Sequence, residues 1–148
     1  MVKNYPIETL GNTPEFEELL IQKAEQEQRV GKLRDWVYLL EIYIRQKEII
    51  SHNPFLESEE FVLEDELPPS IKVLERHIRP EYEGRLYRWG MEEVSVGNFR
   101  IIYIIYDYYK VLLLHYFDKQ YNGDVKRTDI EPAETIYEEY LQKYLSSY

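Results

Sequence analysis

Basic and aromatic side chains are interleaved along the second half of the sequence, and this combination can bind a nucleic acid. Cations hold phosphate groups, and aromatic rings stack on bases. The aromatic residues could equally belong to a protein core and the cations to a solvated surface. The basic residues of this region are Arg85, Arg88, Arg100, His115, Lys119, Lys126 and Arg127, and the aromatic ones are Tyr87, Trp89, Tyr103 and Tyr116.

Other common site chemistries lack the residues that they need. The chain has no Cys, which excludes disulfides, thiolate-bound metals and thiol nucleophiles. Its three histidines, His52, His77 and His115, lie far apart and form no metal-ligand spacing. Glycine-rich phosphate loops, zinc-protease helices and serine-hydrolase elbows are also missing from the sequence. The sequence therefore predicts neither a metal site nor a cofactor.

The charge distribution is uneven. The 148 residues carry a net charge of −10, which argues against a general nucleic-acid binder. Residues 1–70 have a net charge of −8 and residues 129–148 of −4, whereas residues 71–128 have a net charge of +2. No run approaches the roughly 18 apolar residues of a membrane span, and residues 1–11 lack the apolar core of a signal peptide. We expect a cytoplasmic protein.

The first part of the chain has the periodicity of helices. Thr13 and Pro14 form a helix start, with the Thr hydroxyl as the expected N-cap, and apolar residues follow at helical spacing. Gly31 marks a turn, and a second helix is expected to end at residues 52–54. Its apolar stripe comprises Leu33, Trp36, Val37, Leu40, Tyr43, Ile44 and Ile50. Residues 5–10 could form a short strand, and residues 57–66 are an acidic connector.

The later part of the chain has the composition of strands. A short helix is expected over residues 71–78, because Pro80 would end it. Residues 85–89, 93–96, 99–106 and 111–117 are rich in β-branched and aromatic residues and predict an antiparallel meander. A final helix is expected to begin at Pro132. This order predicts an α+β fold in one domain, with helices packed on a small meander.

Four short motifs resemble the RelE/ParE toxin superfamily, in its HigB-like, phage-derived branch. Residues 97–103 (GNFRIIY) resemble its Gly-x-x-Arg strand, and residues 113–119 (LLHYFDK) its Leu-Leu-His-x-Phe-x-Lys strand. Residues 129–133 (DIEPA) resemble the start of its C-terminal helix, and Tyr140 falls where the family often has Tyr. The resemblance covers about residues 67–142, so residues 1–66 would be an acidic helical extension of a RelE-like core.

This resemblance implies an mRNA endoribonuclease that acts on the ribosome. A ribose 2′-hydroxyl attacks the adjacent phosphorus without a metal, which requires proton carriers and fixed cations. The implied catalytic residues are Arg100 as phosphate clamp, His115 as acid or base, Lys119, and Tyr140. Arg88, Lys126 and Arg127 would bind the substrate. The implied partners are a cognate antitoxin, and the ribosome with its mRNA.

The sequence also departs from the family pattern. In the first meander strand, Arg88 replaces a Glu and Gly90 replaces an Arg, and Lys119 is followed by Gln120 where the family has a second Lys. Two alternatives therefore stay open. The chain could be a catalytically inactive or ParE-like binding protein on the same fold, from a phage or mobile element. It could also be an unrelated α+β domain.

The charge division suggests a further hypothesis about the acidic helices. Residues 14–66 could pack near the basic strand face and weaken its attraction for RNA. Deleting residues 1–60 would then raise RNA affinity, unless Trp36 contacts the sheet and makes the helices part of the core.

Overall fold

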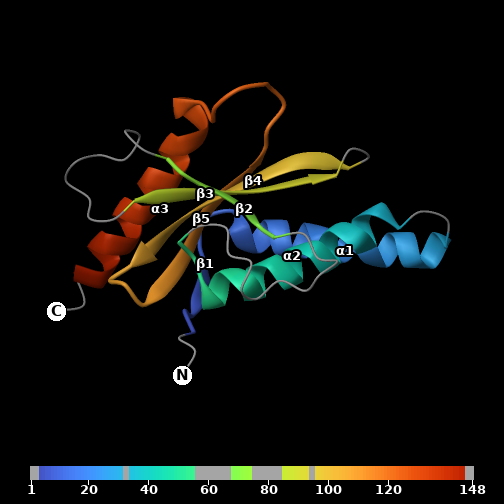
Figure 1. Cartoon of the computed structure of the whole chain (residues 1–148), viewed down its shortest axis with the longest axis horizontal. Coiled ribbons are helices and arrows are strands. Elements are labelled where there is room, and N and C mark those ends of the chain that lie inside the picture. Colours follow the sequence, from blue (N-terminus) through green and yellow to red (C-terminus); the bar gives the residue numbers. More distant parts are fainter. Residues whose placement is uncertain (1–3, 32–33, 56–67, 75–84, 94–95, 146–148) are drawn as a thin grey trace.

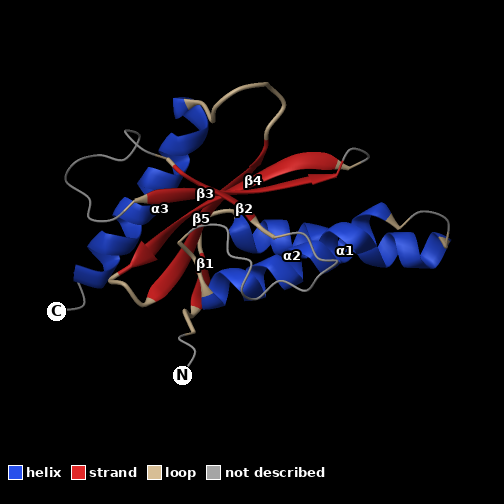
Figure 2. Ribbon diagram, viewed as in Figure 1, coloured by secondary structure: helices blue, strands red, loops and turns tan. Residues whose placement is uncertain are grey.

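The computed structural model describes residues 4–31, 34–55, 68–74, 85–93 and 96–145. Helices cover both faces of one five-stranded sheet (Figures 1 and 2). The elements in chain order are β1 (Ile7–Thr9), α1 (Thr13–Val30), α2 (Asp35–His52), β2 (Ser70–Val73), β3 (Leu86–Glu93), β4 (Gly97–Tyr106), β5 (Lys110–Asp118) and α3 (Arg127–Leu145). The α+β fold class, with its N-terminal helices and C-terminal helix, is confirmed.

The sheet is built around the predicted meander. Strands β3, β4 and β5 are consecutive antiparallel neighbours, and β2 pairs antiparallel with β3 at one edge. At the other edge β1 pairs with β5 in parallel, so the strand order is β1-β5-β4-β3-β2 and the sheet is mixed. The short strand predicted within residues 5–10 is confirmed as β1.

Each face of the sheet packs against its own helical layer. On one face, Phe16 and Leu20 of α1 and Tyr43 of α2 join a core cluster with Trp89 and Ile101. We call this the α1–α2 face. On the other face, which we call the α3 face, Ile130, Ala133 and Tyr137 pack on strand residues that include Ile102, Ile104 and Leu112. Because successive strand residues point to opposite faces, an apolar run such as residues 101–104 supplies both cores.

The region around residue 71 was predicted incorrectly. Residues 71–73 belong to strand β2 rather than to a helix, and residues 75–78 lie outside the described part. Ile71 and Val73 are β-branched, and β3 provides the hydrogen-bonding partner that a local periodicity argument does not consider. The predicted helix end at Pro80 and the acidic connector over residues 57–66 also lie outside the described residues.

Two predicted helix starts also need correction. Helix α1 begins at Thr13, but the Thr13 hydroxyl donates to the carbonyls of Leu10 and Leu113 instead of capping the helix. Helix α3 begins at Arg127, and Pro132 lies inside it. Pro132 is the sixth residue of α3, so it removes the one backbone hydrogen bond that an N–H at this position would donate to the carbonyl four residues earlier, and the helix continues through it. Pro132 therefore does not mark the boundary.

The buried side of α2 is rotated relative to the predicted stripe. Its buried residues are Leu39, Tyr43, Gln46, Ile49 and Ile50, whereas Ile44 is 56% exposed. Gln46 is buried because its side-chain oxygen accepts a hydrogen bond from Trp89 Nε1 at 2.8 Å. A polar residue thus lies inside the core, where an apolarity pattern cannot find it.

Candidate phosphate-binding site

Strand alternation brings basic side chains together on the α3 face. Lys72 of β2 is opposite Arg88 of β3, and Arg88 is opposite Ile102 of β4, whose side chain belongs to the α3-face core. Arg100 lies two residues before Ile102 and so points to the same face. Three strands therefore present cations on one side of the sheet.

These cations line one cavity together with the segment that follows β5. The cavity has a volume of about 580 Å³ and is lined by Lys72, Val73, Leu74, Arg88, Arg100, Lys119, Gly123, Asp124 and Val125. We call it the cationic pocket. Among these lining residues four side chains are basic and one is acidic, so the pocket favours an anion.

Two of the cations are largely removed from water. Arg88 is 8% exposed, and its Nη2 donates to Ser70 Oγ at 2.8 Å. Lys119 is 9% exposed, and its Nζ donates to the Gly123 carbonyl. Burial lowers the pKa of Lys119, as do the positive charges of Arg100, Arg88 and Lys72, while Asp124 acts in the opposite direction. An added anion would relieve this repulsion between buried cations.

Arg100 is a half-buried cation of the same pocket. Burial lowers its pKa, while the negative charges of Glu92 and Asp118 and the nearby Tyr121 raise it. A guanidinium stays protonated over the range in which proteins are folded, so Arg100 keeps its charge despite this burial.

His115 lies near the pocket but does not line it. A register shift between Ile102 and Tyr103 leaves Leu114 without a partner and pairs His115 with Ile102. Arg88 pairs with Ile102 from the other side, which places His115 two strands, or about 10 Å, from Arg88. The imidazole stacks on Phe117, with ring centroids 5.9 Å apart. Burial lowers the pKa of His115, although Asp129 opposes this, so the ring is neutral at pH 7.

The structure separates Tyr140 from the cations of the pocket. Its hydroxyl accepts a hydrogen bond from Lys110 Nζ at 3.2 Å, and its ring packs on Tyr106. Lys110 begins β5 and Lys119 follows its end, so the two places are about 30 Å apart along the strand. Tyr140 and Arg100 therefore do not share a site in this structure.

Lys126 and Arg127 lie beside the pocket without lining it. The Lys126 ammonium lies over the Tyr121 ring, 4.5 Å from its centroid. Arg127 pairs with the buried carboxylate of Glu134 and lies 3.7 Å from Glu131. Of the seven predicted site residues, the pocket thus collects Arg88, Arg100 and Lys119.

Lys72 is the cation that the sequence analysis missed. Its position on the α3 face depends on residues 70–73 forming a strand in register with β3. Recognition of that strand would have placed Lys72 opposite Arg88, because the β-branched residues on either side of it fit a strand.

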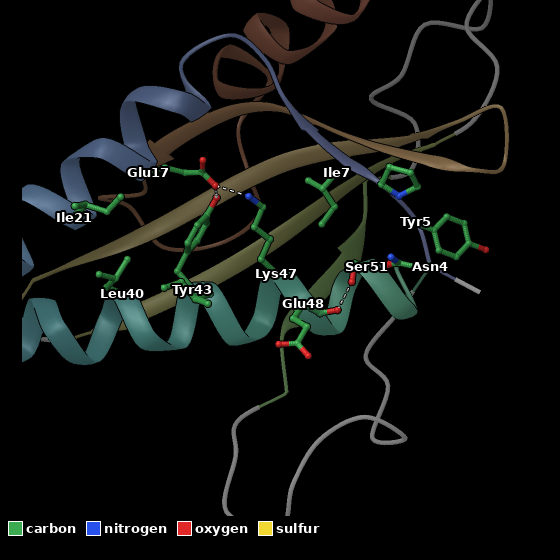
Figure 3. Close-up of a pocket in the computed structure, with 12 residues that line it drawn as sticks. Asn4, Tyr5, Ile7, Glu17, Ile21, Leu40, Tyr43, Lys47, Glu48 and Ser51 are labelled. Carbon is green, nitrogen blue, oxygen red and sulfur yellow. Dashed lines mark hydrogen bonds and ion pairs between the residues drawn. The ribbon is translucent and has the colours of Figure 1, made fainter. Parts of the chain in front are cut away.

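A second pocket lies between α1, α2 and β1 (Figure 3). It measures about 510 Å³ and has a mostly apolar lining that includes Ile7, Ile21, Leu40 and Ile44. The Glu17 carboxylate lies between two partners, the Tyr43 hydroxyl at 2.5 Å and the Lys47 ammonium at 2.6 Å. Burial and Glu17 raise the pKa of Tyr43. These contacts join α1 to α2 and give the Glu17 carboxylate hydrogen-bond partners.

The hypothesis about the acidic helices is not supported by their placement. Helices α1 and α2 pack on the α1–α2 face, whereas the cationic pocket opens on the α3 face. The Trp36 ring lies 6.2 Å from that of Phe99 and packs on the core cluster of that face. The described helical residues are therefore part of the core and do not cover the pocket.

Comparison of the chain with protein-family models, curated proteins and solved structures finds no match. Among the described residues, no group of three or more His, Asp or Glu is arranged to hold a metal ion. The described helices also include none that is long and apolar enough to cross a membrane. The class that the structure defines is an α+β protein with a cationic pocket on its sheet.

Proposed function

We propose that this protein binds RNA through the cationic pocket and acts on mRNA as a RelE- or HigB-like toxin. The observation that carries the proposal is the convergence of Lys72, Arg88, Arg100 and Lys119 on one cavity. Fixed cations at a sheet surface bind the phosphates of an RNA backbone. The resemblance of residues 97–103 and 113–119 to the toxin strands supports RNA as the anion, because these segments contain Arg100 and Lys119.

The reaction proposed for this site is an intramolecular transesterification of the RNA backbone. The ribose 2′-oxygen forms a bond to the adjacent phosphorus, and the bond from phosphorus to the 5′-oxygen breaks. A base takes the 2′-hydroxyl proton, and an acid gives a proton to the leaving oxygen. Arg100 and Lys119 stabilise the negative charge that builds up on the phosphorane. His115, neutral at pH 7, is the base that lies nearest to these cations among the predicted residues.

A second candidate function is RNA or protein binding without cleavage, on the same fold. The positions of two predicted proton carriers favour it: His115 does not line the pocket, and Tyr140 lies at the far end of β5. A protein of this kind would keep the phosphate-binding cations and lack the chemistry. In both proposals the protein works in the cytoplasm, and a cognate antitoxin is its partner.

A purified translation system tests the proposal, with mRNA cleavage mapped by primer extension. We expect the wild type to cut mRNA at the ribosome, Arg100→Ala and Lys119→Ala to reduce cutting at least 100-fold, and His115→Ala to reduce it at least 10-fold. Arg45→Ala, a cation on α2 that pairs with Glu48, is the matched control and should cut like the wild type.

Direct RNA binding by the same proteins separates the two functions. RNA binding that depends on Arg100, without any cleavage by the wild type, would support the second candidate. A folded wild type that neither binds nor cuts RNA, when present in excess over ribosomes, would exclude both.

A further inference from the structure

The Arg100 guanidinium is held from one side by hydrogen bonds. Its Nη1 donates to the Asn98 side-chain oxygen and, at 3.1 Å, to the Phe99 carbonyl. Within the described part of the chain, neither Nε nor Nη2 of Arg100 has a hydrogen-bond partner, and Nε is shielded from water. The side-on edge formed by Nε and Nη2 therefore keeps its two parallel donors.

This edge is the part of a guanidinium that matches a phosphate. Two parallel N–H groups donate to two oxygens of the same phosphate, which gives a stronger and more directional contact than a point charge gives. A buried Nε–H without an acceptor costs free energy until such an anion arrives. The Nε and Nη2 edge of Arg100 is consequently a pair of parallel donors in a pocket that other cations make positive.

Asn98 connects Arg100 to the second cation of the pocket. While its side-chain oxygen accepts from Arg100, its side-chain nitrogen donates to the Lys119 carbonyl at 3.0 Å. The Asn98 backbone carbonyl also accepts from Lys119 N at 2.7 Å. One amide side chain thus fixes the Arg100 guanidinium relative to the backbone of Lys119.

Gly90 provides the space in which the Arg100 side chain lies. The two residues are cross-strand partners. A Cβ at position 90 would lie 3.3 Å from both Cζ and Nη1 of Arg100, which is too close for ordinary contact. The glycine that replaces an Arg of the toxin pattern therefore makes room for another Arg.

We propose that Arg100 grips a phosphate through its Nε and Nη2 edge, and that Asn98 and Gly90 are the residues that position it. This rests on the proposed function in that the phosphate belongs to RNA. The assignment explains one departure from the toxin pattern, the glycine at position 90, since an arginine there would occupy the space of the Arg100 side chain.

Titration with inorganic phosphate tests the edge without requiring RNA. The Arg100 Nε–H signal is followed by NMR in the wild type, in Asn98→Ala and in Asn122→Ala, which is the matched control because Asn122 is exposed. We expect phosphate to shift this signal in the wild type and in Asn122→Ala, with at least fivefold weaker binding in Asn98→Ala. A wild-type signal that phosphate leaves unchanged would overturn the proposal.

A double-mutant cycle with a non-cleavable 2′-fluoro RNA oligonucleotide tests the coupling. Arg100→Lys, which keeps the charge but loses the paired donors, should bind at least tenfold more weakly than the wild type. Asn98→Ala should weaken binding about fivefold in the wild type and less than twofold in Arg100→Ala, because Asn98 acts through Arg100. Gly90→Ala should likewise weaken RNA binding when Arg100 is present, and should have a smaller effect in Arg100→Ala. Two results would contradict the proposal. One is wild-type affinity in Arg100→Lys, and the other is a double variant whose loss of affinity equals the product of the losses in Asn98→Ala and Arg100→Ala.

The two experiments also distinguish this inference from the proposed function. A phosphate-induced shift of the Arg100 signal in a protein that does not bind RNA would support the donor edge and exclude RNA as its ligand. RNA binding that is insensitive to Arg100→Lys and to Asn98→Ala would support the proposed function and overturn the inference.

Discussion

At the scale of the residue, burial sets the protonation of His115. In the unfolded chain its imidazole has an ordinary pKa of about 6.5, and burial in the folded protein lowers this pKa, with Asp129 opposing the shift. Between the two pKa values the unfolded chain binds more protons than the folded one. Stability from this residue is therefore fully present above a pH of about 6.5 and is lost as the pH falls from there through the lower pKa of the folded protein.

The variant His115→Gln should remove this part of the pH dependence. Urea unfolding at pH 7.5, 6.5 and 5.5 measures the free energy of unfolding of both proteins. We expect the wild type to lose more stability than the variant between pH 7.5 and 5.5, since glutamine does not titrate. Parallel pH profiles for the two proteins would show that folding does not change the pKa of His115.

At the scale of the element, one side chain fixes the start of α1 to the sheet. The Asn12 side-chain nitrogen donates to the Tyr116 carbonyl at 3.0 Å, and its oxygen accepts from Tyr116 N at 2.8 Å. The side chain thus behaves as a short strand partner for β5 just beyond the register shift at Leu114. This contact orients α1 above the α1–α2 face.

Asn12→Ala should lower the free energy of unfolding by about 2 kcal/mol, because two partly buried hydrogen bonds contribute about 1 kcal/mol each. Chemical denaturation measures the change, and Asn122→Ala, at an exposed loop position, should unfold like the wild type. Equal stability of Asn12→Ala and the wild type would mean that water replaces the asparagine at no cost.

At the scale of the whole molecule, the two faces of the sheet differ in what they carry. The α1–α2 face holds a core in which Phe16, Tyr43 and Trp89 pack ring against ring. The α3 face is covered by α3 over part of its area and carries the cationic pocket beside it. The net charge of −10 acts on an approaching polyanion through its long-range field, whereas the pocket acts only at short range.

Deleting residues 1–60 should prevent folding. The deletion removes β1, α1 and α2 and uncovers buried residues of the sheet such as Trp89, Ile101 and Leu113. Burial of one large apolar side chain contributes about 2 kcal/mol, so loss of this layer exceeds the stability of an ordinary domain. Circular dichroism and NMR of the fragment measure the outcome. A cooperatively folded fragment with raised RNA affinity would restore the idea that the helices only screen the site.

The sequence by itself determined the order of the elements apart from β2, and part of the pocket. Local composition identifies β3, β4 and β5, because β-branched and aromatic residues favour strands wherever they lie. The strand motifs identify Arg100 and Lys119 as site candidates. Arg88 is a candidate because it is one of the basic residues that are interleaved with aromatic residues in the strand region. These predictions succeed because each one depends on residues that are neighbours in the chain.

Only the tertiary structure decided the rest. Lys72 joins the pocket because β2 pairs with β3, and Tyr140 is kept away because α3 lies along the sheet with that residue near the start of β5. Ile44 is exposed while Gln46 is buried, because the face that α2 presents is set by Trp89 and its hydrogen bond. In each case the partner lies far away in the chain. A periodic pattern gives the faces of an element, whereas the packing partner selects the one that is buried.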